Sequence, residues 1–214
     1  AYINAGLPLD SAALLLVEVA GLPNGVAADT ERIAEIGRRH GARSVRIAKD
    51  EAERALLWKG RKTAFGAIAR IKPNYYLHDT VVPRRMLPEV LRKVYEITER
   101  HGLLVLNVFH AGDGNLHPII AFDRRDADEV ARVHRAGDEI IRACVEMGGT
   151  LSGEHGIGLE KRDYMPLMFS EIDLAAQASL RRAFDPEGLA NPFKVLPSPG
   201  ACGDVQHVPE GAWV

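Results

Sequence analysis

The chain has 214 residues, of which 46% are hydrophobic and 26% charged, as in a globular domain large enough to bury a core. Its net charge is −2 with acidic and basic residues interspersed, which provides no basic surface for nucleic acid and no polybasic anchor for an anionic membrane. No apolar run reaches the roughly 18 residues of a membrane span, and the first residues lack a signal-peptide pattern, so we expect a cytoplasmic protein.

The first part of the chain alternates apolar runs with helical patterns. Residues 12–19 form a short apolar run closed by glycine and proline, which predicts a buried strand. A helix over 27–40, ended by Gly41, and an alternating strand over 43–48 complete a strand–helix–strand unit. A second helical pattern follows over 50–69. The start at an apolar strand, without an initiator methionine, indicates a piece of a longer protein.

The remaining elements predict a sheet that contains a hairpin. In chain order they are a strand over 75–82, a helix with an apolar face from Leu87 to Ile97, a strand over 103–109, a turn at Asp113-Gly114, a strand over 116–122 and a long amphipathic helix from Val130 to Met147. Thr150-Leu151 could form a short further strand, and the rest is mainly helical.

This order of elements predicts an α+β fold. We expect a largely antiparallel sheet covered by helices, ferredoxin-like in the sense of a split β-α-β unit, with a helical C-terminal segment. The fold should occupy residues 1–197 as one domain, followed by a Gly/Pro-rich tail over 198–214.

The strongest chemical signal is a glycine-rich turn with a histidine at each end, His110-Ala-Gly-Asp-Gly-Asn-Leu-His117. Directly opposed residues of an antiparallel pair have Cβ atoms about 5 Å apart, so two imidazoles across this turn can reach one metal ion. The alternative is that the histidines end strands and hydrogen-bond the turn. For a pair at this spacing we favour the metal site.

A second polar cluster lies in Ser-Gly-Glu154-His155-Gly-Ile-Gly. Glu154 is the natural third ligand, because two histidines and one carboxylate leave an open position on a catalytic zinc. His155 would then point elsewhere and serve as a base near neutral pH. Taken alone, the segment could also be a helix-capping connection, and its glycines do not follow the order of a dinucleotide-binding loop.

Two further segments are weaker candidates. Arg61 stands in a helical pattern with apolar neighbours, where a guanidinium can bind a carboxylate, although a solvated surface charge is the commoner case. The segment from Asp185 to Lys194 is punctuated by proline and glycine, and on its own it predicts only a chain end packed on the domain.

These motifs, in this order, resemble the C-terminal region of the FAD-linked oxidases of the vanillyl-alcohol oxidase superfamily, closest to the flavin subunits of glycolate oxidase and D-lactate dehydrogenase type. The resemblance runs from about residue 12 to residue 197. It implies a substrate-capping domain whose FAD-binding domain precedes it and is absent from this chain, so the fragment alone should not turn over substrate.

The resemblance also implies roles for particular residues. His110, His117 and Glu154 would bind a divalent metal, zinc or manganese, and His155 would take the substrate hydroxyl proton while hydride passes to FAD. Arg61 would hold the substrate carboxylate. Asn191, in the terminal motif, would contact the flavin.

The implied substrate is a small 2-hydroxy acid, glycolate or D-lactate. Relatives that act on dicarboxylic acids carry polar groups where this chain has Phe65 and Leu77. The implied partners are the FAD-binding domain and further oxidase subunits, including an iron–sulfur subunit, which could attach the protein to the inner membrane.

Two other functions remain open at the level of sequence. A stand-alone metal-dependent hydrolase could use the same ligands to activate water and would work without flavin. A non-catalytic subunit-docking domain would bind no metal, and substitution of His110 or His117 would have no effect.

Overall fold

The computed structural model describes residues 6–8 and 10–197, and the predicted tail over 198–214 lies outside the described residues. The chain divides into two compact units, Ala1–Ala67 and Ile68–Val214. The proposal of one domain over 1–197 stays a prediction. Among the described helices, none combines the length and apolar character that a membrane crossing requires.

The first unit is built from helices. These are α1 (Pro23–Arg39), α2 (Glu51–Lys62) and most of α3 (Ala64–Ile68). Asp50 caps α2 by accepting a hydrogen bond from the backbone N–H of Glu53. The single helix predicted over 50–69 is interrupted at Thr63, whose hydroxyl donates to the carbonyl of Lys59.

The strands predicted over 12–19 and 43–48 are wrong, because both segments are irregular in the structure. These segments make side-chain ion pairs rather than backbone hydrogen bonds between strands. Arg43 binds Asp10 through two hydrogen bonds of 2.7 and 2.8 Å, and Arg54 donates to Glu18 over 2.7 Å. An apolar run satisfies the strand pattern but becomes a strand only where another strand supplies hydrogen bonds.

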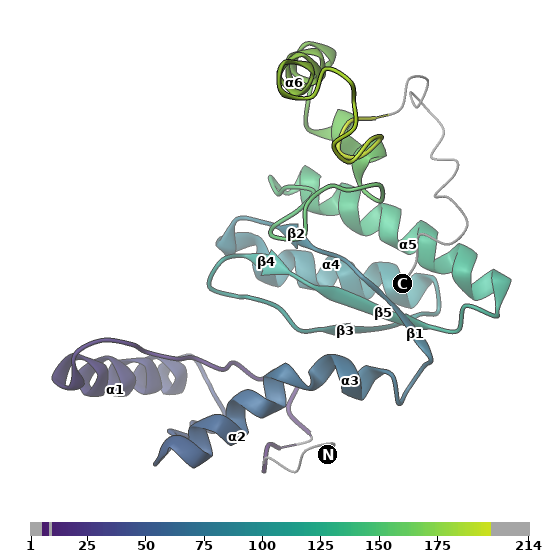
Figure 1. Ribbon diagram of the computed structural model, residues 1–214. Helices are drawn as coiled ribbons and strands as arrows, with labels where there is room; N and C mark the ends of the chain where they lie inside the picture. The colour runs from purple at the N-terminus through teal and green to yellow at the C-terminus, as the bar shows by residue number, and fades with distance from the viewer. Residues whose placement is uncertain (1–5, 9, 198–214) are drawn as a thin grey trace. The chain divides into compact units, whose positions relative to one another are not determined.

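The second unit contains the predicted split β-α-β arrangement (Figure 1). The central strand β5 (Pro118–Phe122) is antiparallel to both β1 (Asn74–Leu77) and β3 (Leu104–Asn107), so β1 and β3 run parallel to each other. They are connected by the short helix η1 (Arg84–Met86) and by α4 (Leu87–Arg100). The α+β fold class is confirmed.

The strand predicted over 75–82 is divided into β1 and β2 (Thr80–Val81). Its partner is divided in the same way, into β4 (Asn115–Leu116) and β5. The backbone N–H of His78 donates to the carbonyl of Pro118 over 2.9 Å, but Pro118 has no N–H to donate in return. The registers on both sides of this gap are continuous, with Leu77 opposite Ile119 and Thr80 opposite Leu116, so Asp79 lies opposite His117.

The short strand predicted at Thr150-Leu151 is reduced to a single antiparallel bridge between Thr150 and Val81. Gly149 keeps the backbone close to β2 here, because a Cβ on it would lie 2.3 Å from the carbonyl oxygen of Val81. The fourth strand of a ferredoxin-like sheet is therefore represented by one residue. After Thr150 the chain leaves the sheet and forms the loop that carries Glu154.

Two long helices, α4 and α5 (Ala127–Glu146), pack against each other and against the sheet. The core residues of these elements include Tyr76 and Ile120 from the strands. Side chains alternate between the two faces of a strand, so Asp79 and His117, which are an odd number of residues away from these core positions, belong to the opposite face. Ile119 and Ala121 of β5 are buried on the same side as His117, so the polar residues form a patch on a partly apolar face.

The predicted helical C-terminal segment is confirmed. It consists of η2 (Arg162–Leu167) and α6 (Glu171–Phe184). Ser170 and Asp173 form a capping box at the start of α6, in which each side chain binds the backbone N–H of the other residue. Tyr164 and Met165 of η2 join Ile141 and Leu151 in a second apolar cluster.

Candidate functional site

The sequence predicted that His110 and His117 lie directly opposite each other across the glycine-rich turn, but the structure places them on the same face of the hairpin at positions that are not opposed. His110 forms a bridge with Asn115, and the backbone N–H of Val108 points to the carbonyl of His117. The two histidines are therefore a diagonal pair. Their ring centroids are still only 5.6 Å apart, because long side chains bridge the diagonal of a sheet.

Gly114 makes this turn fit against the neighbouring strand. Its φ of +73° lies in the left-handed region, and a Cβ on it would lie 2.2 Å from the carbonyl oxygen of Val82. The backbone carbonyl of Gly114 accepts a hydrogen bond from the N–H of Val82. The turn is consequently held against the end of β2, which fixes the position of His110.

Glu154 reaches both histidines from the loop after the Thr150 bridge. Its Oε1 lies 3.1 Å from Nε2 of His117 and 3.9 Å from Nε2 of His110. One ligand atom from each of the three residues lies within 4.8 Å of the other two. The predicted ligands are thus brought together from two parts of the chain that are far apart in sequence.

His155 belongs to the same cluster, whereas the sequence predicted that it would point elsewhere. Its ring stacks on His117 with centroids 5.2 Å apart, and its Nε2 lies 3.6 Å from Oε1 of Glu154. Neighbouring side chains diverge in a regular strand, but this segment curls around a buried carboxylate and does not alternate. His155 therefore stands where it can contact a molecule bound at the cluster.

The buried carboxylate is that of Asp79, which sequence reasoning missed. It accepts hydrogen bonds from the hydroxyl of Ser152 (2.6 Å) and from the backbone N–H groups of residues 153–155. Burial acts to raise the pKa of Asp79, but these hydrogen bonds and the charge of Lys161 outweigh it and hold the pKa well below its usual range. A usable signal was present, because His78-Asp79 interrupts an otherwise apolar strand.

The three predicted ligands fit a divalent metal ion. Burial lowers the pKa of His117, as does the charge of His155, and Glu154 only partly offsets these effects, which favours the neutral imidazole that metals bind. Nε2 of His117 is buried and has no hydrogen-bond partner among the described residues, although a carboxylate lies 3.1 Å away. Two nitrogen ligands and one oxygen ligand match the donor set of catalytic zinc.

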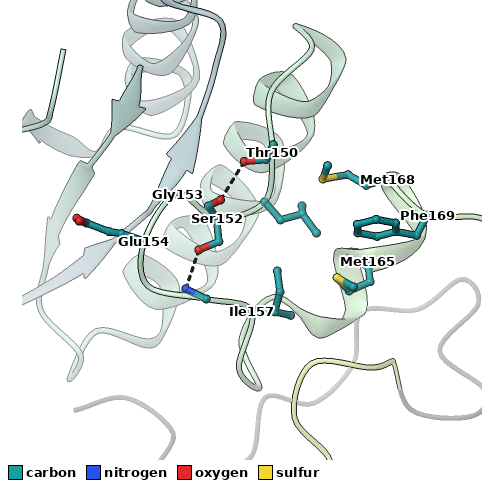
Figure 2. A pocket seen from close by; sticks show the side chains of 10 residues that line it. Thr150, Ser152, Gly153, Glu154, Ile157, Met165, Met168 and Phe169 are labelled. Carbon is teal, nitrogen blue, oxygen red and sulfur yellow. Dashed lines mark hydrogen bonds between the residues drawn. The ribbon is translucent and has the colours of Figure 1, made fainter. Parts of the chain in front are cut away.

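The loop that carries Glu154 has an apolar side as well (Figure 2). A pocket of about 440 Å³ is lined there by Leu151, Ile157, Met165 and Phe169, among others. Figure 2 shows the Glu154 side chain projecting away from these apolar side chains. The loop therefore separates an apolar pocket from the polar cluster.

Residues 1–195 match the model of the family described as FAD linked oxidases, C-terminal domain. The chain belongs to this family. Within it, this FAD-linked oxidase C-terminal domain is 45% identical over 212 residues to the glycolate oxidase subunit GlcD of Escherichia coli (strain K12), an alignment that covers 98% of this chain and 42% of the relative.

Two other relatives are also similar to most of this chain. The glycolate oxidase subunit GlcD of Bacillus subtilis (strain 168) is 37% identical over 195 residues, covering 91% of this chain and 42% of that protein. A probable mitochondrial D-lactate dehydrogenase of Danio rerio is 33% identical over 184 residues, covering 85% and 37%. The chain thus spans less than half the length of these curated relatives.

The two remaining predicted site residues, Arg61 and Asn191, come from other parts of the chain. Arg61 is half-buried on α2, in the first unit of the FAD-linked oxidase C-terminal domain, whereas the cluster belongs to the second unit. Asn191 follows α6 with a φ of +46°, and its side chain accepts a hydrogen bond from Lys194 over 3.2 Å. Their roles in substrate and flavin binding stay predictions.

Proposed function

We propose that this chain is the substrate- and metal-binding part of a flavin-dependent 2-hydroxy-acid dehydrogenase. The observation that carries the proposal is the convergence of His110, His117 and Glu154, with His155 beside them, in a member of this family. The FAD would be held mainly by an N-terminal domain outside this chain. The names of the relatives, glycolate oxidase subunit and D-lactate dehydrogenase, support a small 2-hydroxy acid as substrate.

The residues at the site divide the work between binding and proton transfer. His110, His117 and Glu154 would hold a zinc or manganese ion, which supplies a Lewis acid for the hydroxyl and carboxylate oxygens of the substrate. When bound, FAD supplies the acceptor for the hydride from the alcohol carbon. Nε2 of His155 takes the hydroxyl proton, so that the 2-hydroxy acid becomes the 2-oxo acid.

The substrate carboxylate would be held by Arg61, whose planar guanidinium suits a two-point contact. Phe65 and Leu77, where relatives that act on dicarboxylic acids have polar groups, favour a monocarboxylic acid such as glycolate or D-lactate. Asn191 would contact the flavin. Further subunits, including an iron–sulfur subunit, would accept the electrons in the cytoplasm or at the inner membrane; the word "subunit" in the names of two relatives supports such an assembly.

The metal site is tested by measuring metal content by mass spectrometry on the purified, untagged chain. We expect about one zinc or manganese ion per chain, lost in His110→Ala and in Glu154→Ala, with circular dichroism confirming that both variants fold. His40→Ala, at the C-terminal end of α1, is the control and should retain the ion. Absence of metal from the supplemented, unsubstituted chain would contradict the site.

The reaction is tested with the chain joined to the flavin-binding half. We expect oxidation of glycolate or D-lactate only in the joined protein, and a loss of about 100-fold to 10,000-fold in kcat for His155→Ala. Arg61→Lys should raise KM more than it lowers kcat. Metal-dependent ester or amide hydrolysis by the chain alone would instead favour a hydrolase.

A further inference from the structure

We propose that Asp79 is a positioning residue that holds the loop carrying Glu154 and His155 in place beside His110 and His117. This inference rests on the metal site proposed above and concerns how that site is kept in shape. Asp79 itself is not among the three grouped ligands. Asp79 is fully buried, at 0% exposure, in the gap between β1 and β2.

The contacts of Asp79 converge on one short segment. Its two carboxylate oxygens accept from the hydroxyl of Ser152 at 2.6 Å, from the N–H of Gly153 at 3.0 and 3.1 Å, from the N–H of Glu154 at 3.2 and 3.3 Å, and from the N–H of His155 at 2.9 Å. Three consecutive amides directed at one carboxylate fix the backbone on both sides of Glu154. The direction in which the Glu154 and His155 side chains leave the loop is therefore set by Asp79.

Asp79 is itself anchored in the sheet, opposite His117, so it links the loop to the hairpin that carries two of the proposed ligands. Its Oδ1 lies 3.7 Å from Nε2 of His117. Lys161, also buried, donates to the backbone carbonyl of Asp79 over 2.5 Å and places its ammonium 3.6 Å from Oδ2. The lysine therefore balances the charge without occupying the positions at which the loop amides bind.

Ser152 strengthens the same arrangement from the loop side. Its hydroxyl donates to Asp79 and accepts from the N–H of Gly156 over 2.7 Å, which closes the loop around the carboxylate. The chain thus ties every residue from Ser152 to Gly156 into one hydrogen-bonded turn. Outer partners of metal ligands commonly change metal affinity by 10-fold to 100-fold when they are removed.

The experiment compares the 214-residue chain with its Asp79→Asn and Ser152→Ala variants. Asp79→Asn keeps the size of the side chain but replaces one acceptor oxygen by a donor, which opposes the loop amides. Ile140→Val, a change in the fully buried core of α5, is the control for general loss of stability. Zinc affinity is measured by chelator competition, loop structure by amide hydrogen exchange, and coordination by the visible absorption spectrum of bound cobalt.

We expect Asp79→Asn to weaken zinc binding by about 10-fold or more, to increase exchange of the amides of residues 153–155, and to alter the cobalt spectrum. Ser152→Ala should show the same changes to a smaller extent, and Ile140→Val should show none of them. If Asp79→Asn does not fold, Ser152→Ala decides the question. Normal zinc affinity in the folded Asp79→Asn variant overturns the positioning role of Asp79 but leaves the proposed metal site standing. If Asp79→Asn does not fold, normal zinc affinity in Ser152→Ala has the same meaning. Failure of the unsubstituted chain to bind zinc overturns the proposed metal site and this inference with it.

Discussion

His78 is a fully buried imidazole on the helix-covered face of the sheet. It is 1% exposed, its ring meets the edge of Tyr76 with centroids 4.3 Å apart, and its Nε2 has no hydrogen-bond partner among the described residues. Burial, aided by the charge of Lys161, lowers the pKa of His78 to about 3. The native state therefore holds this side chain neutral and resists its protonation.

The folded protein should lose stability as the pH falls, because unfolded His78 takes up a proton near its usual pKa while folded His78 does not. The stability associated with neutral His78 is fully present above about pH 6.5 and is lost progressively as the pH falls toward 3. Between pH 7 and pH 5 we expect this histidine to account for a loss of about 2 kcal/mol in the free energy of unfolding. Urea titrations at several pH values should show that His78→Gln loses about 2 kcal/mol less between pH 7 and pH 5 than the unsubstituted chain and His40→Gln do. An equal pH slope in all three proteins would refute this role.

Lys161 and Asp79 form a buried ion pair, with side chains 4% and 1% exposed. Removal of one partner leaves the other charge uncompensated, so Lys161→Met should lower the free energy of unfolding by about 3 kcal/mol. Arg142→Met is the matched control, because its pair with Asp138 is 44% and 32% exposed and should contribute less than about 1 kcal/mol. Chemical denaturation provides both values, and similar losses for the two variants would contradict the prediction.

The proximity of His110 and His117 could be predicted from sequence because a turn between two strands makes its ends neighbours. The residues that position them could not, since Asp79 and Ser152 are 73 positions apart and meet only through the fold. The geometry of the histidine pair also escaped sequence reasoning. A shift of register by two residues keeps both side chains on one face, and nothing in the motif distinguishes the opposed pair from the diagonal one.

At the scale of elements, helix α5 lies close enough to the sheet that one position must be glycine. A Cβ on Gly137 would lie 2.8 Å from Cε1 of Tyr76 and 2.9 Å from the His78 ring. Gly37, inside α1, has ordinary van der Waals space around its own missing Cβ, with the nearest atom at 3.6 Å. Alanine substitutions at these two glycines therefore distinguish the energetic effect of close packing from that of helix propensity.

Gly137→Ala should destabilise the protein by about 1–3 kcal/mol, because the helix or the two rings must shift. Gly37→Ala, the matched control, should be neutral or stabilising by up to about 1 kcal/mol, since alanine favours a helix more than glycine does. Thermal unfolding followed by circular dichroism compares the two. Equal stabilisation by both substitutions would show that α5 can move away from the sheet at little cost.

The helices were predictable from sequence to within a few residues, because an apolar stripe at helical spacing needs no distant partner to form its hydrogen bonds. The strands were less predictable. The run over 75–82 was found but its division at Pro118 was not, since the missing N–H belongs to a residue 40 positions later than His78. The runs over 12–19 and 43–48 carry the strand pattern without a paired strand, which composition alone cannot reveal.

At the scale of the whole molecule, the two units differ in how much they bury. Helix α2 of the first unit has no buried residue, whereas α5 of the second has eight. Local opening costs less where few side chains are buried. We expect the amides of α2 to exchange with solvent on the order of 10-fold or more faster than those of α5, as measured by hydrogen exchange with mass spectrometry. Equal protection of the two helices would show that α2 is stabilised by more than its burial indicates.

The alternation of side chains along the sheet has a consequence for evolution and for engineering. Tyr76 and Ile120 support the core that the helices cover, while Asp79 and His117, on the other side of the strands, belong to the proposed site. A library aimed at new activities should leave Ile119 and Ala121 unchanged, because both are fully buried at odd-numbered positions of β5. A deletion of one residue would exchange the two roles and damage both at once, so substitutions rather than deletions should account for the natural diversity of these strands.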